Sequence, residues 1–538
     1  LLAKQYPFPP NSKIPDSIDL GITRKNQCVS GGKFSDYVRD YPYGGMPFAV
    51  TGLSDQEYAL LAGWVKKGAV ITDEPVTLTG GEKESLQQWE SFFNRDDNRS
   101  KLVARWLYEH LFMATLYFPD LDGKLRFFEL IRSSTPPGRD VIPISTVFPN
   151  EDPEQPFFYR IRPIVGNILH KRRMPYPLNH AKQRRINELF FTHEWPVSDL
   201  PGYSYAERVN PFATFAAIPA YARYRFMLDD AEYYVRNVIH GPVCRGQIAT
   251  DVIRDRFWVL FQNPESDPFI TNNAYQHQAV PLLEMPGQND DPLAMGEEWL
   301  RYLSHHNDYL AQRRSQYVLQ YPGGASLDHL WDGDNRNKDA LLTIARHYDS
   351  ASVARGLIGD IPQTLWLMDY PLLERTYYIL VVNYNVFGNV AHQLLTRLYF
   401  DLIRNSSEHN FLRMIPDGQR TDILHDWYQH SGKLKFGIFY EKIDDVSPSA
   451  ENFTTDDPKQ ELALRILQRF ESINAMANDP INRCQAMSCV RSDQPLWIQK
   501  ADQALSAIAA RPAADLAGIN WLPEVTFVRV KHDQDKRT

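Results

Sequence analysis

The part of the chain that comes nearest to a membrane span is TYYILVVNYNVFGNVA, residues 376–391, and asparagine interrupts it three times. A helix needs about 20 mostly apolar residues to cross a bilayer, and an amide side chain is costly in hydrocarbon. The sequence therefore predicts a globular chain that builds its own core. At 538 residues the chain is too long for one ordinary core, so we expect two or three domains.

Composition and charge exclude several classes of protein. With 43% hydrophobic and 23% charged residues, the chain is neither disordered nor fibrous, and a 12% aromatic share favours large apolar surfaces or grooves. The formal charge of −8 gives no field that attracts nucleic-acid phosphates, so we expect no nucleic-acid partner. The basic clusters at residues 170–176 and 182–185 are interpreted as solvated faces, with weak contact to anionic lipid headgroups as the alternative.

Helical and strand-like patterns alternate along the chain and predict an α+β fold that is rich in helix. A large mixed α/β body is expected at residues 76–538, with a β-rich section near 124–165. We expect helices over the ranges 82–118, 296–319, 338–355, 371–404 and 458–472. A capping box of Asp229 and Glu232 is expected to start another helix, and Gly241-Pro242 to end it.

A methionine stands in a turn in the segment YPYGGMPFAVTGLSDQEYALLAGWVKKGA, residues 41–69. A short amphipathic helix is expected directly after it, because Ser54 and Glu57 form a capping box and Gly68 gives a stop. A long apolar side chain gains nothing in an exposed loop, so Met46 should have a partner. In the simplest interpretation, Met46 fills a gap between the loop and the helix.

A second interpretation of the same turn comes from a resemblance. The Met-Pro turn and the helix after it resemble the distal end of a c-type cytochrome domain, where the loop methionine is an axial ligand of haem iron. The resemblance implies that Met46 is this ligand and that residues 1–75 are the C-terminal part of a cytochrome-c-like domain. The attachment motif C-x-x-C-H does not occur in the 538 residues. We therefore expect haem c to be carried by an N-terminal piece ahead of Leu1.

Longer strings carry a further resemblance. They are ARWLYEHLFMATLYF (104–118), RSSTPPG (132–138), RYRFMLDDAEYYVRNVIHGPVCRGQ (223–247), RHYDSASVARGLIGDIPQTLWLMDYPLLER (346–375) and FGNVAHQLLTRLYFDLIRN (387–405). Through them the chain resembles bacterial fatty acid cis/trans isomerase from about residue 10 to at least residue 427. The resemblance implies a haem-containing periplasmic enzyme of Gram-negative bacteria, peripherally associated with the membrane. Its substrates would be the unsaturated acyl chains of membrane phospholipids, or free unsaturated fatty acids, converted from cis to trans without ATP.

The chemistry of this reaction sets what the site must do. The π bond blocks rotation about C=C, so an enzyme must weaken it transiently. A haem would do so by withdrawing electron density, while the protein orients the chain in an apolar groove that excludes water. An electron-transfer cytochrome with a large docking domain, and a lipid- or partner-binding module without activity, are the alternative functions.

Candidate catalytic residues come from the strings quoted above. Cys244 and Arg245 occupy a short loop between two expected helices, and loops on rigid scaffolds often hold functional groups. The alternative for Cys244 is a small buried hydrophobe. His110 and Glu109 lie together on one expected helix, where the alternative for His110 is a satisfied core histidine. Arg225 is the last of the candidate catalytic residues.

Arg225 also has a structural interpretation. It belongs to a charged cluster around a helix start with Arg223, Asp229 and Glu232, and ion pairing explains such a cluster without catalysis.

Overall fold

The computed structural model describes residues 31–42, 53–69, 76–123, 125–166, 173–241, 256–285, 295–346, 351–359, 361–385, 388, 390–428, 444, 447–475 and 495–509. The chain divides into two compact units, Leu1–Thr77 and Leu78–Thr538, and each is treated by itself.

The described part of the first unit contains η1 (Gly31–Lys33), α1 (Phe34–Asp40) and α2 (Asp55–Lys66). The predicted capping box at the start of α2 is confirmed: Ser54 accepts from the backbone N–H of Glu57, and the Glu57 carboxylate accepts from the backbone N–H of Ser54 at 2.8 Å. Apolar side chains of α2 are exposed to solvent, with Trp64 45% and Val65 62% exposed.

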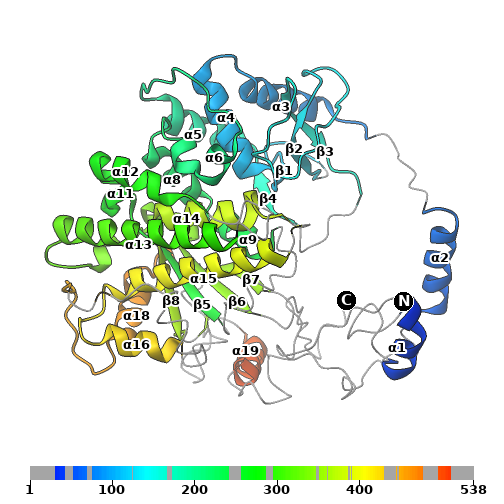
Figure 1. Ribbon diagram of the computed structural model, residues 1–538. Coiled ribbons are helices and arrows are strands. Elements are labelled where there is room, and N and C mark those ends of the chain that lie inside the picture. The colour runs from blue at the N-terminus through cyan, green and yellow to red at the C-terminus, as the bar shows by residue number, and fades with distance from the viewer. Residues whose placement is uncertain are drawn as a thin grey trace. The chain divides into compact units, whose positions relative to one another are not determined.

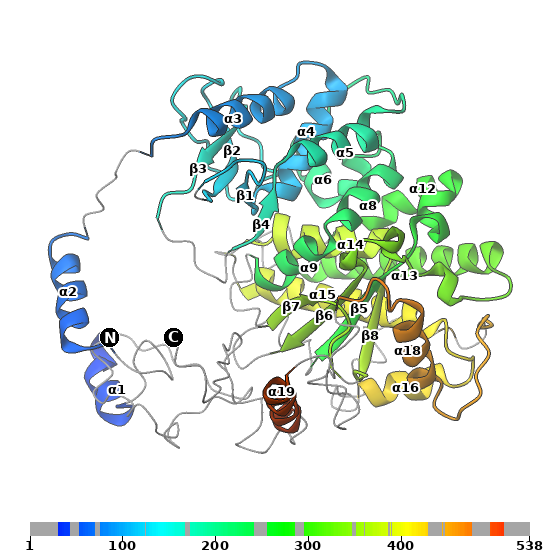
Figure 2. The same cartoon turned by 180° about the vertical axis from the view of Figure 1, so that it is seen from behind.

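Helices make up most of the described part of the second unit (Figures 1 and 2). The α-helices are α3 (Gly80–Phe93), α4 (Asn98–Leu111), α5 (His180–Phe191), α6 (Tyr205–Val209), α7 (Pro211–Thr214), α8 (Ala220–Asp229), α9 (Ala231–His240), α11 (Pro268–Thr271), α12 (Asn273–Ala279), α13 (Met295–Gln320), α14 (Tyr370–Tyr377), α15 (Val390–Leu412), α16 (Arg420–Trp427), α18 (Pro458–Arg469) and α19 (Leu496–Ala509). The shorter turns are η3 (Pro264–Ser266), η4 (Val280–Leu283), η5 (Leu327–His329), η6 (Gly333–Asn335), η7 (Lys338–Ala340) and the π-helical η8 (Tyr378–Val382).

Two four-stranded mixed sheets accompany these helices. The strands are β1 (Thr115–Tyr117), β2 (Phe128–Ser133), β3 (Phe158–Pro163), β4 (Pro175–Pro177), β5 (Arg256–Phe261), β6 (Leu341–Arg346), β7 (Ala351–Arg355) and β8 (Thr364–Met368). The first sheet has the order β3-β2-β1-β4 and the second β7-β6-β5-β8. In each, the last pair is parallel and the other pairs are antiparallel.

The second sheet forms the centre of the unit. Residues 257–261 of β5 and all of β8 are buried, which is the pattern of strands that are covered on both faces. Helix α15 packs against β8 and α9 against β7, with α13 alongside α15 (Figure 1). In the first sheet, β2 instead alternates between buried and half-buried residues over its first four positions, because one face is less covered.

The fold is α+β and rich in helix, as predicted, with two small mixed sheets. The helices expected at 296–319 and 458–472 are confirmed by α13 and α18. Strands β2 and β3 lie within residues 124–165, where a β-rich section is expected. Within the described residues, no helix has both the length and the apolar run that a membrane crossing needs.

Three helix predictions need correction. The range 82–118 holds α3, α4 and then β1, because Asp97 caps a new helix by accepting from the Ser100 N–H. The range 338–355 is wrong: it forms β6 and β7, since pairing with β5 overrides the local periodicity. The range 371–404 is broken between η8 and α15.

The capping box predicted for Asp229 and Glu232 is also wrong. Helix α9 begins at Ala231, and Asp229 belongs to α8, where its carboxylate accepts from Arg185 at 2.6 Å. The N–H of Glu232 donates instead to Asp339 at 3.1 Å. The predicted stop is confirmed, since α9 ends at His240.

Candidate functional site

His110 lies at the C-terminal end of α4 and has no exposed surface. Its Nδ1 lies 2.7 Å from the carbonyl oxygen of Trp106, and a carbonyl only accepts, so Nδ1 carries the proton. Nε2 is left with a lone pair and no hydrogen-bond partner among the described residues. Burial lowers the pKa of His110 to about 3, so the ring is neutral at physiological pH.

Two further buried charges stand beside this ring. Oε1 of Glu374, on α14, lies 3.8 Å from Nε2 of His110 and accepts from Nε1 of Trp106 at 3.2 Å. Arg223, on α8, approaches the same oxygen to 4.0 Å with its Nη1. Burial raises the pKa of Glu374, and the charge of Arg223 opposes that rise. We call His110, Arg223 and Glu374 the His110 cluster.

Aromatic rings close the His110 cluster from several sides. Tyr377 stacks on the imidazole at 5.1 Å between centroids and 9° between planes, and Trp106 lies at 3.9 Å. The hydroxyls of Tyr377 and Tyr233 both donate to the carbonyl oxygen of His110, at 2.9 and 3.1 Å. The cluster thus joins α4, α8, α9 and α14. Since the three side chains of the cluster have no exposed surface, they position these helices and do not touch a substrate as they stand.

Glu109 is adjacent to His110 but has its own partners. Its carboxylate accepts from Nε of Arg105 at 3.0 Å and from the Tyr378 hydroxyl at 2.7 Å. It is buried and ties α4 to the turn η8. Glu109 therefore lies next to His110 in the chain but stabilises the contact between α4 and η8.

Arg225 is not part of the His110 cluster. It donates to Asp334 at 3.1 Å and lies 3.7 Å from Asp229. Residues two apart on a helix face different directions, so Arg225 points elsewhere than Arg223. Ion pairing thus accounts for Arg225, whereas Arg223 turns inward to Glu374. Met46, Cys244 and Arg245 lie outside the described residues.

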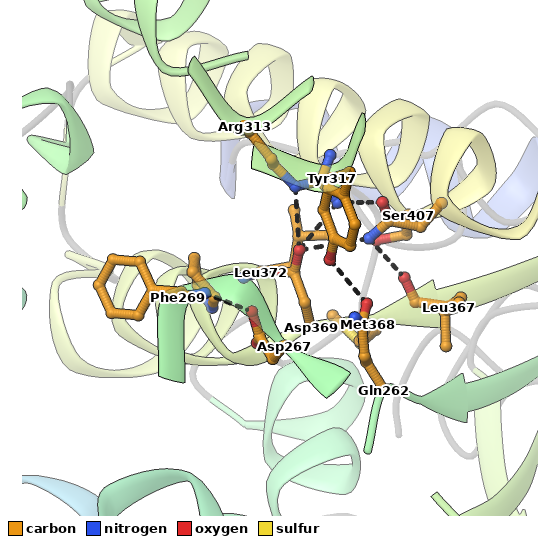
Figure 3. A network of polar contacts seen from close by, with 12 residues as sticks. Gln262, Asp267, Phe269, Arg313, Tyr317, Leu367, Met368, Asp369, Leu372 and Ser407 are labelled. Carbon is orange, nitrogen blue, oxygen red and sulfur yellow. Dashed lines mark hydrogen bonds and ion pairs between the residues drawn. The ribbon is translucent and has the colours of Figure 1, made fainter. Parts of the chain in front are cut away.

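A second buried network lies between α13, α14 and α15 (Figure 3). Arg313 donates to Asp369 at 2.8 Å, and the Tyr317 hydroxyl donates to Oε1 of Gln262 at 2.8 Å. Asp267 accepts from the backbone N–H groups of Phe269 and Tyr370, at 2.9 and 3.0 Å. Burial, and next the charge of Asp369, raise the pKa of Asp267 to about 7.

Comparison with known proteins decides the family. The family model for fatty acid cis/trans isomerase matches residues 1–538. The chain belongs to the fatty acid cis/trans isomerase family. It is an isomerase enzyme, and nothing in the comparisons supports the electron-transfer alternative. No curated protein matches the chain, and no solved structure does.

His110 does not fit as a ligand of the haem that the resemblance implies. His110 offers a nitrogen of the right type in its unpartnered Nε2, but Tyr377 and Glu374 enclose it and leave it no exposed surface. No group of three or more His, Cys, Asp or Glu side chains that could hold a metal ion occurs among the described residues. No step of the reaction is therefore derived through haem from this part of the enzyme.

Sequence reasoning missed Arg223 and Glu374 as partners of His110. It interpreted Arg223 as part of a charged cluster around a helix start, explained by ion pairing. A usable signal was present: Glu374 and Arg375 interrupt a largely apolar and aromatic stretch, PLLERTYYILVV, residues 371–382. A charged residue in such a stretch is buried with its helix and requires a partner.

Proposed function

We propose that the enzyme converts the cis double bonds of membrane acyl chains to trans, in place and without ATP. The family match over the whole chain carries this proposal. The electron-withdrawing group would be haem c, with Met46 as an axial ligand and the attachment motif on a separate N-terminal piece. The exposed apolar residues Leu60 and Val65 of α2 support such a partner, since a second surface can cover them.

The proposal includes where the enzyme acts and which residues are candidates for catalysis. A periplasmic enzyme in peripheral contact with the membrane has direct access to phospholipid acyl chains or to fatty acids released from them. Cys244 and Arg245 are kept as candidate catalytic residues. The His110 cluster would hold the scaffold that presents them, because α9 ends at His240, shortly before their loop.

The test is acyl-chain analysis after incubation of the intact protein with oleate or with dioleoyl phospholipid. We expect the trans isomer to increase, with the double bond at its original position. A haem-free preparation of the same chain is the matched control and should form none. A preparation whose visible spectrum shows bound haem c, and which still forms no trans isomer from either substrate, would contradict the proposal.

A further inference from the structure

A small cavity lies between the second half of α13 and the C-terminal end of α15. Its volume is about 60 Å³, room for a group of a few heavy atoms. Four arginines line it: Arg313, Arg314, Arg413 and Arg420. Among the described residues that line it, Asp444 supplies the one carboxylate, and much of the remaining wall is apolar, including Leu310 and Val318. We call this cavity the arginine pocket.

Among the described residues, Arg313 and Arg314 each lie beside a carboxylate. Arg313 donates to Asp369 at 2.8 Å, just behind the wall of the pocket. Arg314 lies 3.8 Å from Oδ2 of Asp444. Asp369 and Asp444 are thus described carboxylates beside two of the four lining guanidinium groups.

Arg420 donates hydrogen bonds to backbone carbonyl groups near the C-terminal end of α15, so its guanidinium is satisfied without a ligand. Its Nε donates to the carbonyl oxygen of Ile415 at 2.8 Å, and its two terminal nitrogens donate to those of Asp444 and Arg413, at 2.6 and 3.2 Å. The contacts with Arg413 and Ile415 satisfy carbonyl groups just beyond the end of the helix. Arg413 is thus not required for that purpose.

Arg413 is held differently. Its guanidinium carbon lies 3.4 Å from the centroid of the Tyr317 ring. Among the described residues its side chain donates a long hydrogen bond, 3.5 Å to Oδ1 of Asn410. No carboxylate of the described chain lies within 4.0 Å of it. Arg313 stands near the same ring at 5.2 Å and donates to the same Asn410 oxygen. Burial and the charge of Arg313 both lower the pKa of Arg413.

We propose that the arginine pocket binds the oxyanion at the head of the acyl substrate, with Arg413 as its ionic partner. An oxyanion placed there accepts charge-assisted hydrogen bonds and offsets the repulsion between two neighbouring guanidinium groups. The apolar wall beside Val318 gives the first methylene groups a place to lie. The carboxylate of a free fatty acid and the phosphate of a phospholipid share this chemistry. The inference rests on the proposed function, which supplies the acyl substrate.

Binding of oleate to the full-length chain, measured by calorimetry, tests the pocket without turnover. In Arg413→Gln the affinity for oleate should fall roughly 10- to 100-fold, the size of a lost charge-assisted contact. Affinity for oleyl alcohol, which has the same chain and no charge, should not change. The matched control is Arg336→Gln, which removes an exposed arginine from a separate charged cleft and should leave both affinities unchanged.

A second variant covers the case in which Arg413→Gln does not fold. Val318 lines the pocket and is 47% exposed, so Val318→Glu should fold and repel an anion. We expect a several-fold loss of oleate affinity that shrinks as salt is added. Dihexanoylphosphatidylglycerol, a soluble phospholipid, separates the two sources. If it displaces oleate from wild type, the pocket takes the phosphate as well as the carboxylate. If it does not, the pocket takes the carboxylate alone.

Two results would overturn the assignment. One is oleate affinity within twofold of wild type in both pocket variants, and the other is an equal loss in Arg336→Gln. A failure of the proposed function can be distinguished from a failure of the pocket assignment. If wild type binds oleate through Arg413 but forms no trans isomer, the pocket stands and the function does not. If oleate is isomerised equally by wild type and Arg413→Gln, with equal affinity, the function stands and the pocket does not.

Discussion

Arg223 and Arg413 both place a charge inside the second unit, but their surroundings are opposite. Arg223 has no exposed surface and faces the buried carboxylate of Glu374 at 4.0 Å. Arg413 is half-buried, lines a cavity and has no carboxylate within 4.0 Å in the described chain. A buried charge that has its counter-ion serves the fold, whereas a charge beside a cavity without a counter-ion leaves a place for an anion. We therefore interpret the surroundings of Arg223 as a structural centre and those of Arg413 as a binding site.

The largest expected effect comes from breaking the pair inside the His110 cluster. Glu374→Gln leaves the guanidinium of Arg223 buried beside a neutral amide, and we expect the free energy of unfolding to fall by about 3–5 kcal/mol. Urea unfolding measures it. The double variant Arg223→Met/Glu374→Leu buries no charge and should recover most of the loss. If the double variant is as unstable as the single one, the unpaired charge is not the cause.

A pH effect of the same cluster follows from His110. Its pKa is about 3 in the fold, while an unfolded histidine takes up its proton near pH 6.5. Between these values the unfolded chain binds one more proton, so this group lowers stability as pH falls, by about 1.4 kcal/mol per pH unit. His110→Asn keeps a donor near Nδ1 and removes the titration. Unfolding free energies at pH 7 and pH 5 should therefore differ less in His110→Asn than in wild type, and an unchanged difference would rule the effect out.

The arrangement of these charges could be predicted from the sequence only in part. The α+β class, α13, α18 and the cap of α2 follow from local patterns, because each depends on residues within one element. The strands β6 and β7 do not, because pairing with a strand more than 80 residues away decides them. His110 was visible as a candidate, yet its partners Arg223 and Glu374 come from two other helices. The arginine pocket is likewise a product of distant segments, which spacing along one helix does not reveal.

The network behind the arginine pocket should respond to pH in the opposite direction. The carboxyl of Asp267 has a pKa of about 7 in the fold and near 4 when unfolded, so between these values the folded chain holds one more proton. Its contribution is full below pH 4 and falls by about 1.4 kcal/mol per pH unit as pH rises toward 7. In Asp267→Asn this slope should vanish, whatever the absolute stability, and urea unfolding at pH 5 and pH 7 measures it. A slope equal to that of wild type would show that Asp267 is ionised in the fold.

The smallest effect is expected where an ion pair is neither buried nor beside a cavity. Glu129 and Arg162 face each other across β2 and β3 at 2.7 Å, with side chains 35% and 40% exposed. Water solvates both charges, so Glu129→Gln should lower the free energy of unfolding by less than about 1 kcal/mol. The pair matches Arg223–Glu374 in chemistry and differs in burial, so measuring both variants under one condition isolates burial. A loss as large as that of Glu374→Gln would mean that burial is not what separates them, and the contrast drawn between Arg223 and Arg413 would lose its physical basis.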